Sequence, residues 1–117
     1  RKNIPALIDL GKAYYRIEQW DRSIAIYSYI MTLQNNYGLV KTNLAMSYAM
    51  KGDISKAKQY FSEALGEDPK DISALDGMAQ LLKFEGKTTE AKEIWEKILA
   101  LEPTHRRSII ELKKAQN

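Results

Sequence analysis

The sequence contains no cysteine, a single histidine (His105) and no long uninterrupted hydrophobic run. Without cysteine the chain forms no disulfide framework, thiolate metal site or cysteine nucleophile. One histidine excludes a multi-histidine metal centre within the chain, and we interpret His105 as a solvent-facing turn residue. The glycines are isolated and form no phosphate-binding loop. We therefore predict a protein that is not an enzyme and that binds no cofactor.

The charge is mixed and nearly balanced. Eighteen Lys and Arg residues oppose 15 Asp and Glu residues, and the resulting net charge of +3 does not by itself indicate a nucleic-acid partner. A basic group near the C-terminus lacks the interleaved aromatic residues of an RNA-binding surface; it comprises Arg106, Arg107, Lys113 and Lys114. We predict no nucleic-acid partner, and an RNA-binding helical array remains a less favoured alternative.

The length of 117 residues, with 44% hydrophobic and 28% charged residues, is typical of one soluble folded domain. No stretch is long and apolar enough to predict a membrane span. The chain begins at Arg1 without a methionine, which is typical of an excised fragment. The compartment stays open: cytoplasmic, or envelope or periplasmic if a signal or anchor lies upstream of Arg1.

Compared with itself, the sequence repeats at an offset of 34 residues. The first copy is marked by Leu7, Leu10, Gly11, Tyr14, Ser23, Tyr27 and Ile30. The second is marked by Lys41, Leu44, Ala45, Tyr48, Ala57, Phe61 and Ala64, and the third by Leu75, Met78, Ala79, Leu82, Ala91, Trp95 and Ile98. The register holds without insertion or deletion, which predicts three repeats at about residues 4–37, 38–71 and 72–105.

Each repeat has the pattern of two helices, because its apolar residues recur at spacings of three and four. Gly52 followed by Asp53 indicates a helix end and a new N-cap, while Pro69 and Pro103 end second helices and Thr104 is a candidate cap. We predict helices near residues 4–17, 20–34, 37–50, 54–67, 72–85, 88–101 and 105–116. Small residues recur at two positions that are equivalent in the three repeats, which we call phases, and an aromatic residue lies beside them. These small residues allow the backbones of the two paired helices to approach closely.

A 34-residue helix–turn–helix unit with these small residues, turn glycines and terminal prolines resembles the tetratricopeptide repeat (TPR) family. The resemblance covers residues 4–103, and 105–116 resembles the extra C-terminal helix of such arrays. It implies an all-α, right-handed α-solenoid of three repeats plus a capping helix, in one domain over 1–117. Lys41 departs from the pattern, since a large apolar residue is usual there.

The need to bury apolar surface also predicts that the helical pairs stack, independently of the resemblance. A single helical pair cannot cover its own apolar face, so neighbours must stack and the last face needs a lid. We predict that the final helix supplies this lid with Ile109, Ile110 and Leu112 facing the stack.

In TPR proteins the first helices of the repeats commonly line a concave groove that holds a peptide or a partner's helix. The resemblance places ten residues there: Ile8, Lys12, Tyr15, Thr42, Asn43, Met46, Ala49, Asp76, Gln80 and Lys83. Ile8, Tyr15 and Met46 would be apolar anchors among polar groups able to contact a peptide backbone. The alternative interpretation is that Tyr15 and Met46 only pack between neighbouring first helices.

One TPR subclass clamps the C-terminal carboxylate of cytosolic chaperones with basic and asparagine side chains at set groove positions. In this sequence those positions hold Ile8, Lys12, Asn43, Ser73 and Gly77. Only Asn43 matches, so the sequence argues against a carboxylate clamp.

A second surface is indicated by the absence of charge. No charged residue occurs from Ser23 to Val40, and the outward phase of this helix carries Ala25, Ile26 and Tyr29. This surface predicts self-association as a homo-oligomer or docking of a partner or of another part of the chain. Scattered apolar surface residues are also ordinary in monomers. The leading prediction is thus a protein–protein interaction module or scaffold whose partner is another protein or peptide segment, with self-association as the alternative.

Overall fold

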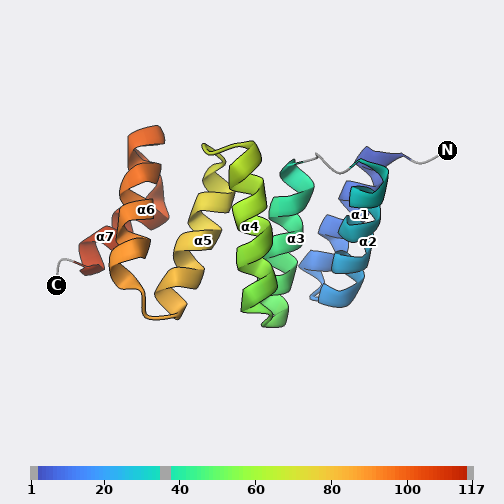
Figure 1. Ribbon diagram of the computed structural model, residues 1–117, viewed down its shortest axis with the longest axis horizontal. Helices are drawn as coiled ribbons and strands as arrows, with labels where there is room; N and C mark the ends of the chain where they lie inside the picture. The colour runs from blue at the N-terminus through green and yellow to red at the C-terminus, as the bar shows by residue number, and fades with distance from the viewer. Residues whose placement is uncertain (1–2, 35–37, 116–117) are drawn as a thin grey trace.

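The computed structural model describes residues 3–34 and 38–115, which form seven α-helices and no strand. The helices are α1 (Ile4–Arg16), α2 (Trp20–Leu33), α3 (Gly38–Lys51), α4 (Ile54–Glu67), α5 (Ile72–Phe84), α6 (Thr88–Leu101) and α7 (Arg106–Ala115). They follow one another along an elongated molecule (Figure 1). The predicted all-α solenoid of helix–turn–helix repeats is confirmed. Residues 35–37 and 116, which belong to predicted elements, lie outside the described residues.

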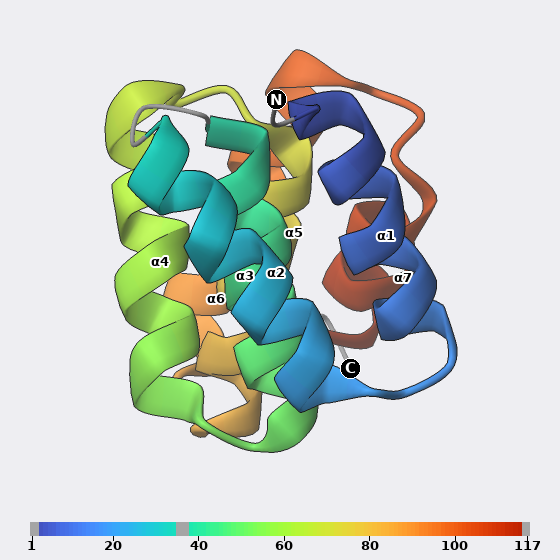
Figure 2. The same cartoon turned by 90° about the vertical axis from the view of Figure 1, so that its right-hand side faces the viewer.

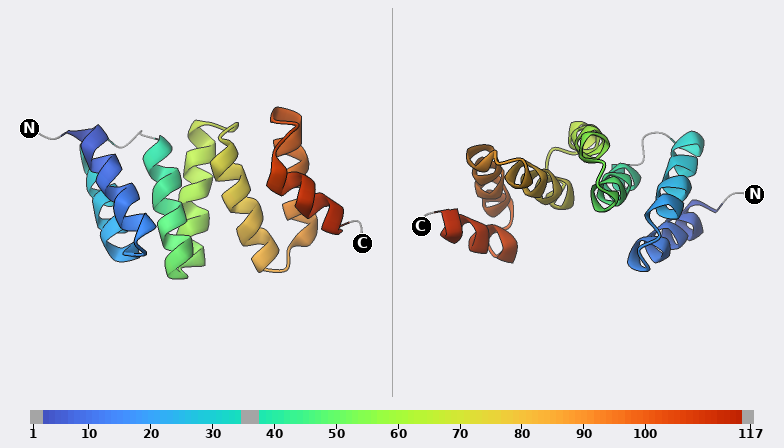
Figure 3. Two further views of the ribbon diagram at one scale, coloured as in Figure 1. Left: turned by 180° about the vertical axis from the view of Figure 1, so that it is seen from behind. Right: turned by 90° about the horizontal axis from the view of Figure 1, so that it is seen from below.

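The helices form two rows when the molecule is seen from below (Figure 3, right). The second helix of each pair (α2, α4, α6) lies in one row, and the first helices lie in the other together with α7. Each second helix also packs against the first helix that follows it, so that α2 contacts α3, α4 contacts α5 and α6 contacts α7. The chain therefore buries its apolar faces by stacking rather than around one central core.

Two kinds of residue set the turns inside the pairs. Gly52 and Gly86 adopt φ angles of +97° and +83°, which a residue with a side chain adopts only with strain. In the first pair the same place is occupied by Glu18 at φ +62°. Asp53 then caps α4, because its carboxylate accepts a hydrogen bond from the Lys56 backbone N–H at 3.1 Å.

The start of α7 differs from the sequence prediction. The helix begins at Arg106, and His105 rather than Thr104 serves the first turn: its Nδ1 accepts from the Ser108 backbone N–H at 3.3 Å and lies 2.8 Å from Ser108 Oγ. His105 is therefore half-buried and bonded, not the solvent-facing turn residue that the sequence predicted.

The aromatic residue of each second helix fills the space between the rows. Tyr27, Phe61 and Trp95 are each no more than 2% exposed. A Cβ atom added at Gly11 would lie 2.7 Å from the Tyr27 ring, and one added at Gly77 would lie 2.3 Å from the Phe61 ring. These contacts are possible only because glycine presents bare backbone to the ring.

Lys41, the departure from the repeat pattern, is 7% exposed between α3 and α4. Its ammonium pairs with Glu67 and lies 3.8 Å from Glu63, which is itself 40% exposed. The aliphatic stem thus takes the place of an apolar side chain while the charge reaches carboxylates at the rim.

The final helix covers the stack, but not with all the predicted residues. Ser108 is fully buried and Leu112 packs beside Trp95, whereas Ile110 is 45% exposed. Ile110 lies 34 residues after Asp76, at the repeat position where each first helix packs against the next first helix. It is exposed because no further helix follows α7 among the described residues. Lys83 in α5 also donates to Glu111 in α7 at 2.8 Å, which ties the lid to the third pair.

Replacement of Gly77 by alanine should destabilise the fold. The new Cβ would meet the buried Phe61 ring, and overpacking of this kind costs about 1–3 kcal/mol. Gly66→Ala is the matched control, since nothing lies within 4 Å of its Cβ position and alanine favours helix by up to about 1 kcal/mol. Urea unfolding of both variants measures the difference; equal stability would show that the Phe61 contact is misplaced.

The stability supplied by the lid should depend on pH through Glu111. The hydrogen bond from Lys83 lowers the pKa of Glu111 below its ordinary value of 4.5. Its contribution is therefore complete above that value and is lost as the pH falls through the lowered pKa. We expect Glu111→Gln to unfold at lower urea concentration than the unmodified chain at pH 7, with the gap closing below pH 4. Glu93→Gln, at an exposed site on α6, should show no such gap at either pH.

Candidate functional site

The row of first helices carries a groove made of two adjacent hollows. The larger, about 470 Å³, lies over α3 and α5, and the smaller, about 270 Å³, lies between α1 and α3. Tyr15 and Met46 line both hollows, so the two lie next to each other. We call the whole the inner groove; its lining residues are Lys12, Tyr15, Arg16, Tyr27, Asn43, Met46, Ala49, Met50, Gly52, Ile54, Phe61, Ser73, Asp76, Gly77, Gln80, Leu81, Phe84 and Arg107.

Most of the predicted groove residues come together in this groove. The seven that line it are Lys12, Tyr15, Asn43, Met46, Ala49, Asp76 and Gln80. They come from α1, α3 and α5, whose turns bring residues three and four apart onto one stripe. The 34-residue register then places equivalent stripes side by side.

The other three predicted residues do not line the inner groove. Ile8 is 6% exposed and belongs to the core of the first pair, while Thr42 is 2% exposed and donates a hydrogen bond to the Asp71 carboxylate at 2.8 Å. Both lie at the phase that faces the next first helix, so neighbouring chain covers them. Lys83 is exposed but is engaged by Glu111 of the lid.

The sequence analysis missed one phase of the lining, formed by Arg16, Met50 and Phe84. These residues are spaced by 34 and lie four positions after Lys12 and its equivalents, so one more turn along the predicted stripe would have found them. Two of them are open apolar side chains: Met50 is 54% exposed and Phe84 is 77% exposed.

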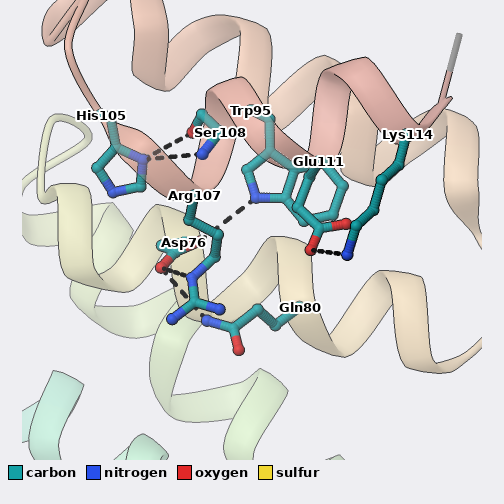
Figure 4. A network of polar contacts seen from close by, with 8 residues as sticks. All are labelled: Asp76, Gln80, Trp95, His105, Arg107, Ser108, Glu111 and Lys114. Atoms are coloured by element: carbon teal, nitrogen blue, oxygen red, sulfur yellow. Dashed lines mark hydrogen bonds and ion pairs between the residues drawn. The ribbon is translucent and has the colours of Figure 1, made fainter.

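One end of the groove is closed by a polar network (Figure 4). The Asp76 carboxylate accepts from Arg107 Nε of α7 at 2.9 Å, from Gln80 Nε2 at 3.3 Å and from Trp95 Nε1 at 3.4 Å. Asp76 is thus largely occupied within the protein. Its charge holds Arg107 over the groove end, and the lid completes the wall there.

The opposite end of the groove is basic, and several of its polar side chains lack a hydrogen-bond or ion-pair partner among the described residues. Lys12 and Arg16 line it, and the structure pairs neither with an acidic side chain within residues 3–34 and 38–115. Asn43 lies beside them, and its buried Nδ2 has no hydrogen-bond partner among those residues. Burial raises the pKa of Tyr15, so its hydroxyl stays protonated at neutral pH. This end therefore offers cations and hydrogen-bond donors.

The second predicted surface lies on α2. Ala25 is exposed and Tyr29 is 36% exposed, while Ile26 is half-buried and packs against the core of the first pair. Self-association through this surface stays a prediction. Among the described residues, no helix combines the length and the apolar character required to cross a membrane.

Solved structures with this arrangement are TPR domains. The Arabidopsis OM64 TPR domain matches with a TM-score of 0.90 and 19% identity, covering 97% of this chain and 93% of that one. The first TPR of Spaghetti (RPAP3), solved with HSP90 peptide SRMEEVD, has a TM-score of 0.89 and 23% identity and covers 95% and 90%. The second TPR domain of human RPAP3, solved with HSP70 peptide SGPTIEEVD, gives 0.84, 24%, 98% and 99% respectively. These likenesses concern the fold.

Among curated proteins, the translocon at the outer membrane of chloroplasts 64 of Pisum sativum is 26% identical over 98 residues. The match covers 84% of this chain but only 16% of that relative's length. A family model described as YpiA-like, C-terminal tetratricopeptide repeats matches residues 39–105, more than half of the chain. The chain therefore belongs to the family of YpiA-like C-terminal tetratricopeptide repeats.

Proposed function

We propose that the protein is a non-enzymatic interaction module that holds a segment of another protein in the inner groove. The observation that carries the proposal is the pair of open apolar side chains, Met50 and Phe84, which stand 54% and 77% exposed at the larger hollow. Large apolar side chains left open in a concave site are typical of binding surfaces. The TPR domains solved with bound HSP90 or HSP70 peptides support the same use of this fold.

The charges of the groove favour an acidic segment with at least one bulky apolar residue. Four charged residues line the groove: Lys12, Arg16 and Arg107 are basic, and Asp76 is acidic. Because Asp76 already accepts from Arg107, the remaining charge is positive. A carboxylate near Lys12 and Arg16 would gain an opposite charge, while an apolar side chain would cover the Met50 and Phe84 surface.

The mode of binding we propose does not use a carboxylate clamp. Where the clamp pattern requires basic side chains, this chain has Ser73 and Gly77. Gly77 cannot be exchanged for a longer residue without displacing the Phe61 ring, because even a Cβ atom would come within 2.3 Å of it. The aromatic packing of the second pair therefore supports recognition by shape and by apolar anchors instead.

Selection from a displayed library of random short segments tests this proposal. We expect the selected segments to combine acidic residues with a bulky apolar residue. Phe84→Ala should weaken their binding by about tenfold or more, equivalent to about 1.4 kcal/mol, because it removes the most exposed apolar contact. Calorimetric titration of a selected segment measures the loss.

Leu39→Ala is the matched control, since Leu39 is 49% exposed but does not line the groove. It should leave the affinity unchanged. A Lys12→Glu, Arg16→Glu double variant should lose affinity for the acidic segments and lose most of the dependence on salt. Equal binding by all variants would place the contact surface elsewhere, with the α2 surface of Ala25, Ile26 and Tyr29 as the next candidate.

A further inference from the structure

One stripe of the first helices is buried or half-buried along most of the array but exposed in α1. At the first phase of this stripe, Val40, Ala74 and Ser108 are each 0% exposed in α3, α5 and α7. The residue 34 positions before Val40 is Ala6 in α1, and it is exposed. The same helix position is thus interior in three helices and open in one.

The next two phases show the same contrast between α1 and α3. Leu44 of α3 is 1% exposed, whereas its equivalent in α1, Leu10, is 41% exposed. Ser47 is fully buried and bonded to Ser23 of α2 across 2.8 Å, whereas its equivalent, Ala13, is exposed. We call Ala6, Leu10 and Ala13 the α1 end face.

In the buried cases the cover is the second helix of the preceding pair. Tyr27 and Ile30 of α2 pack with Val40 and Leu44. The equivalent residues of α4 and α6 cover the next first helices: Phe61 and Ala64 pack with Ala74, and Trp95 and Ile98 pack with Leu112. Each covering helix therefore presents an aromatic residue followed, three positions later, by a smaller apolar one.

No described helix covers the α1 end face. Figure 2 looks onto this end of the molecule, with α1 and α2 nearest to the viewer. The face nevertheless carries only apolar residues, although three exposed positions on one helical stripe would ordinarily include charged ones. It has kept the composition of a stacking surface.

We propose that the α1 end face is a docking site for one further helix of the α2 and α4 kind. The occupant is an amphipathic helix with an aromatic residue and, three positions later, an aliphatic or small residue, supplied by another helical pair stacked in the same register. The face continues, one repeat earlier, the interface that α2 makes with α3 and α4 makes with α5.

The end of α1 adds a requirement for the occupant. At this phase Lys51 pairs with Asp21 of α2 at 2.6 Å, and Glu85 pairs with Lys58 of α4 at 3.0 Å. The equivalent residue after α1 is its C-cap, Ile17, which is 63% exposed. The occupant must therefore present an apolar residue here instead of the charged partner found in the other two interfaces.

The test adds a helical pair in register. A copy of residues 38–71 that carries Lys58→Leu, so that an apolar residue faces Ile17, is joined directly to Ile4; it keeps the 34-residue spacing and places a second α4 beside α1. Hydrogen exchange and thermal unfolding then compare this extended chain with the 117-residue chain. We expect the α1 amides to exchange about tenfold more slowly or better in the extended chain, and its unfolding temperature to rise.

The Leu10→Lys variant tests whether the gain comes from docking on the α1 end face. Lysine forms helix nearly as well as leucine, so the substitution alters the face without weakening α1 itself. It should leave the 117-residue chain unchanged, because Leu10 is open there, and should remove the gain of the extended chain. Leu44→Lys, at the covered equivalent, should destabilise the 117-residue chain strongly. Unchanged α1 exchange, several unfolding transitions in the extended chain, or an equal effect of Leu10→Lys in both chains would overturn the proposal. So would a dimer of the 117-residue chain that Leu10→Lys dissociates, because a second copy would then be the occupant.

Discussion

The buried aromatic residue of each second helix is the contact on which the rest of the structure depends. Tyr27 lies against Gly11 of its own pair and packs with Val40 of the next, and Phe61 lies against Gly77 of the next pair. One ring thus closes a helical pair and stacks it on its neighbour. Aromatic side chains bury large areas with few rotatable bonds, so they suit this double role at little entropic cost. The close approach requires a facing residue without a side chain, which Gly11 and Gly77 provide.

This packing also determines where a binding surface remains. Each first helix after α1 uses one side for its own partner helix, a second side for the preceding pair and a third for the following first helix or α7. Only a narrow stripe is left, and its residues line the inner groove. Thr42 shows how narrow it is: one position away from Asn43, it is fully engaged with Asp71. The groove is therefore a consequence of stacking, and its chemistry lies in the few side chains that packing does not use.

The fold could be predicted from the sequence because it depends on a periodic signal. Three copies in register fixed the helix number and placed the described boundaries to within one residue. The site was predicted less completely, since exposure depends on neighbours that a single repeat does not reveal. Ile8 and Ile110 both occupy the phase that faces the next first helix; Ile8 is buried because α3 follows, and Ile110 is exposed because no described helix does. The bonds of Asp76 and Lys83 to α7 likewise required the position of the lid.

The two ends of the array differ in how the apolar face of the last helix is covered. At the C-terminal end, α7 takes the place of a further first helix, with Ser108 and Leu112 at the interior phases and ion pairs to α5 around them. Its outer side carries Arg106, Lys113 and Lys114, which are exposed and charged. At the other end, α1 keeps alanine and leucine at the phases that a preceding helix would cover. A lid tolerates solvent because its outer face is polar, whereas a stacking face left apolar gains stability only when another helix covers it. The exposed side of α7 is thus mostly charged, with Ile110 as the apolar exception, whereas the α1 end face is apolar throughout.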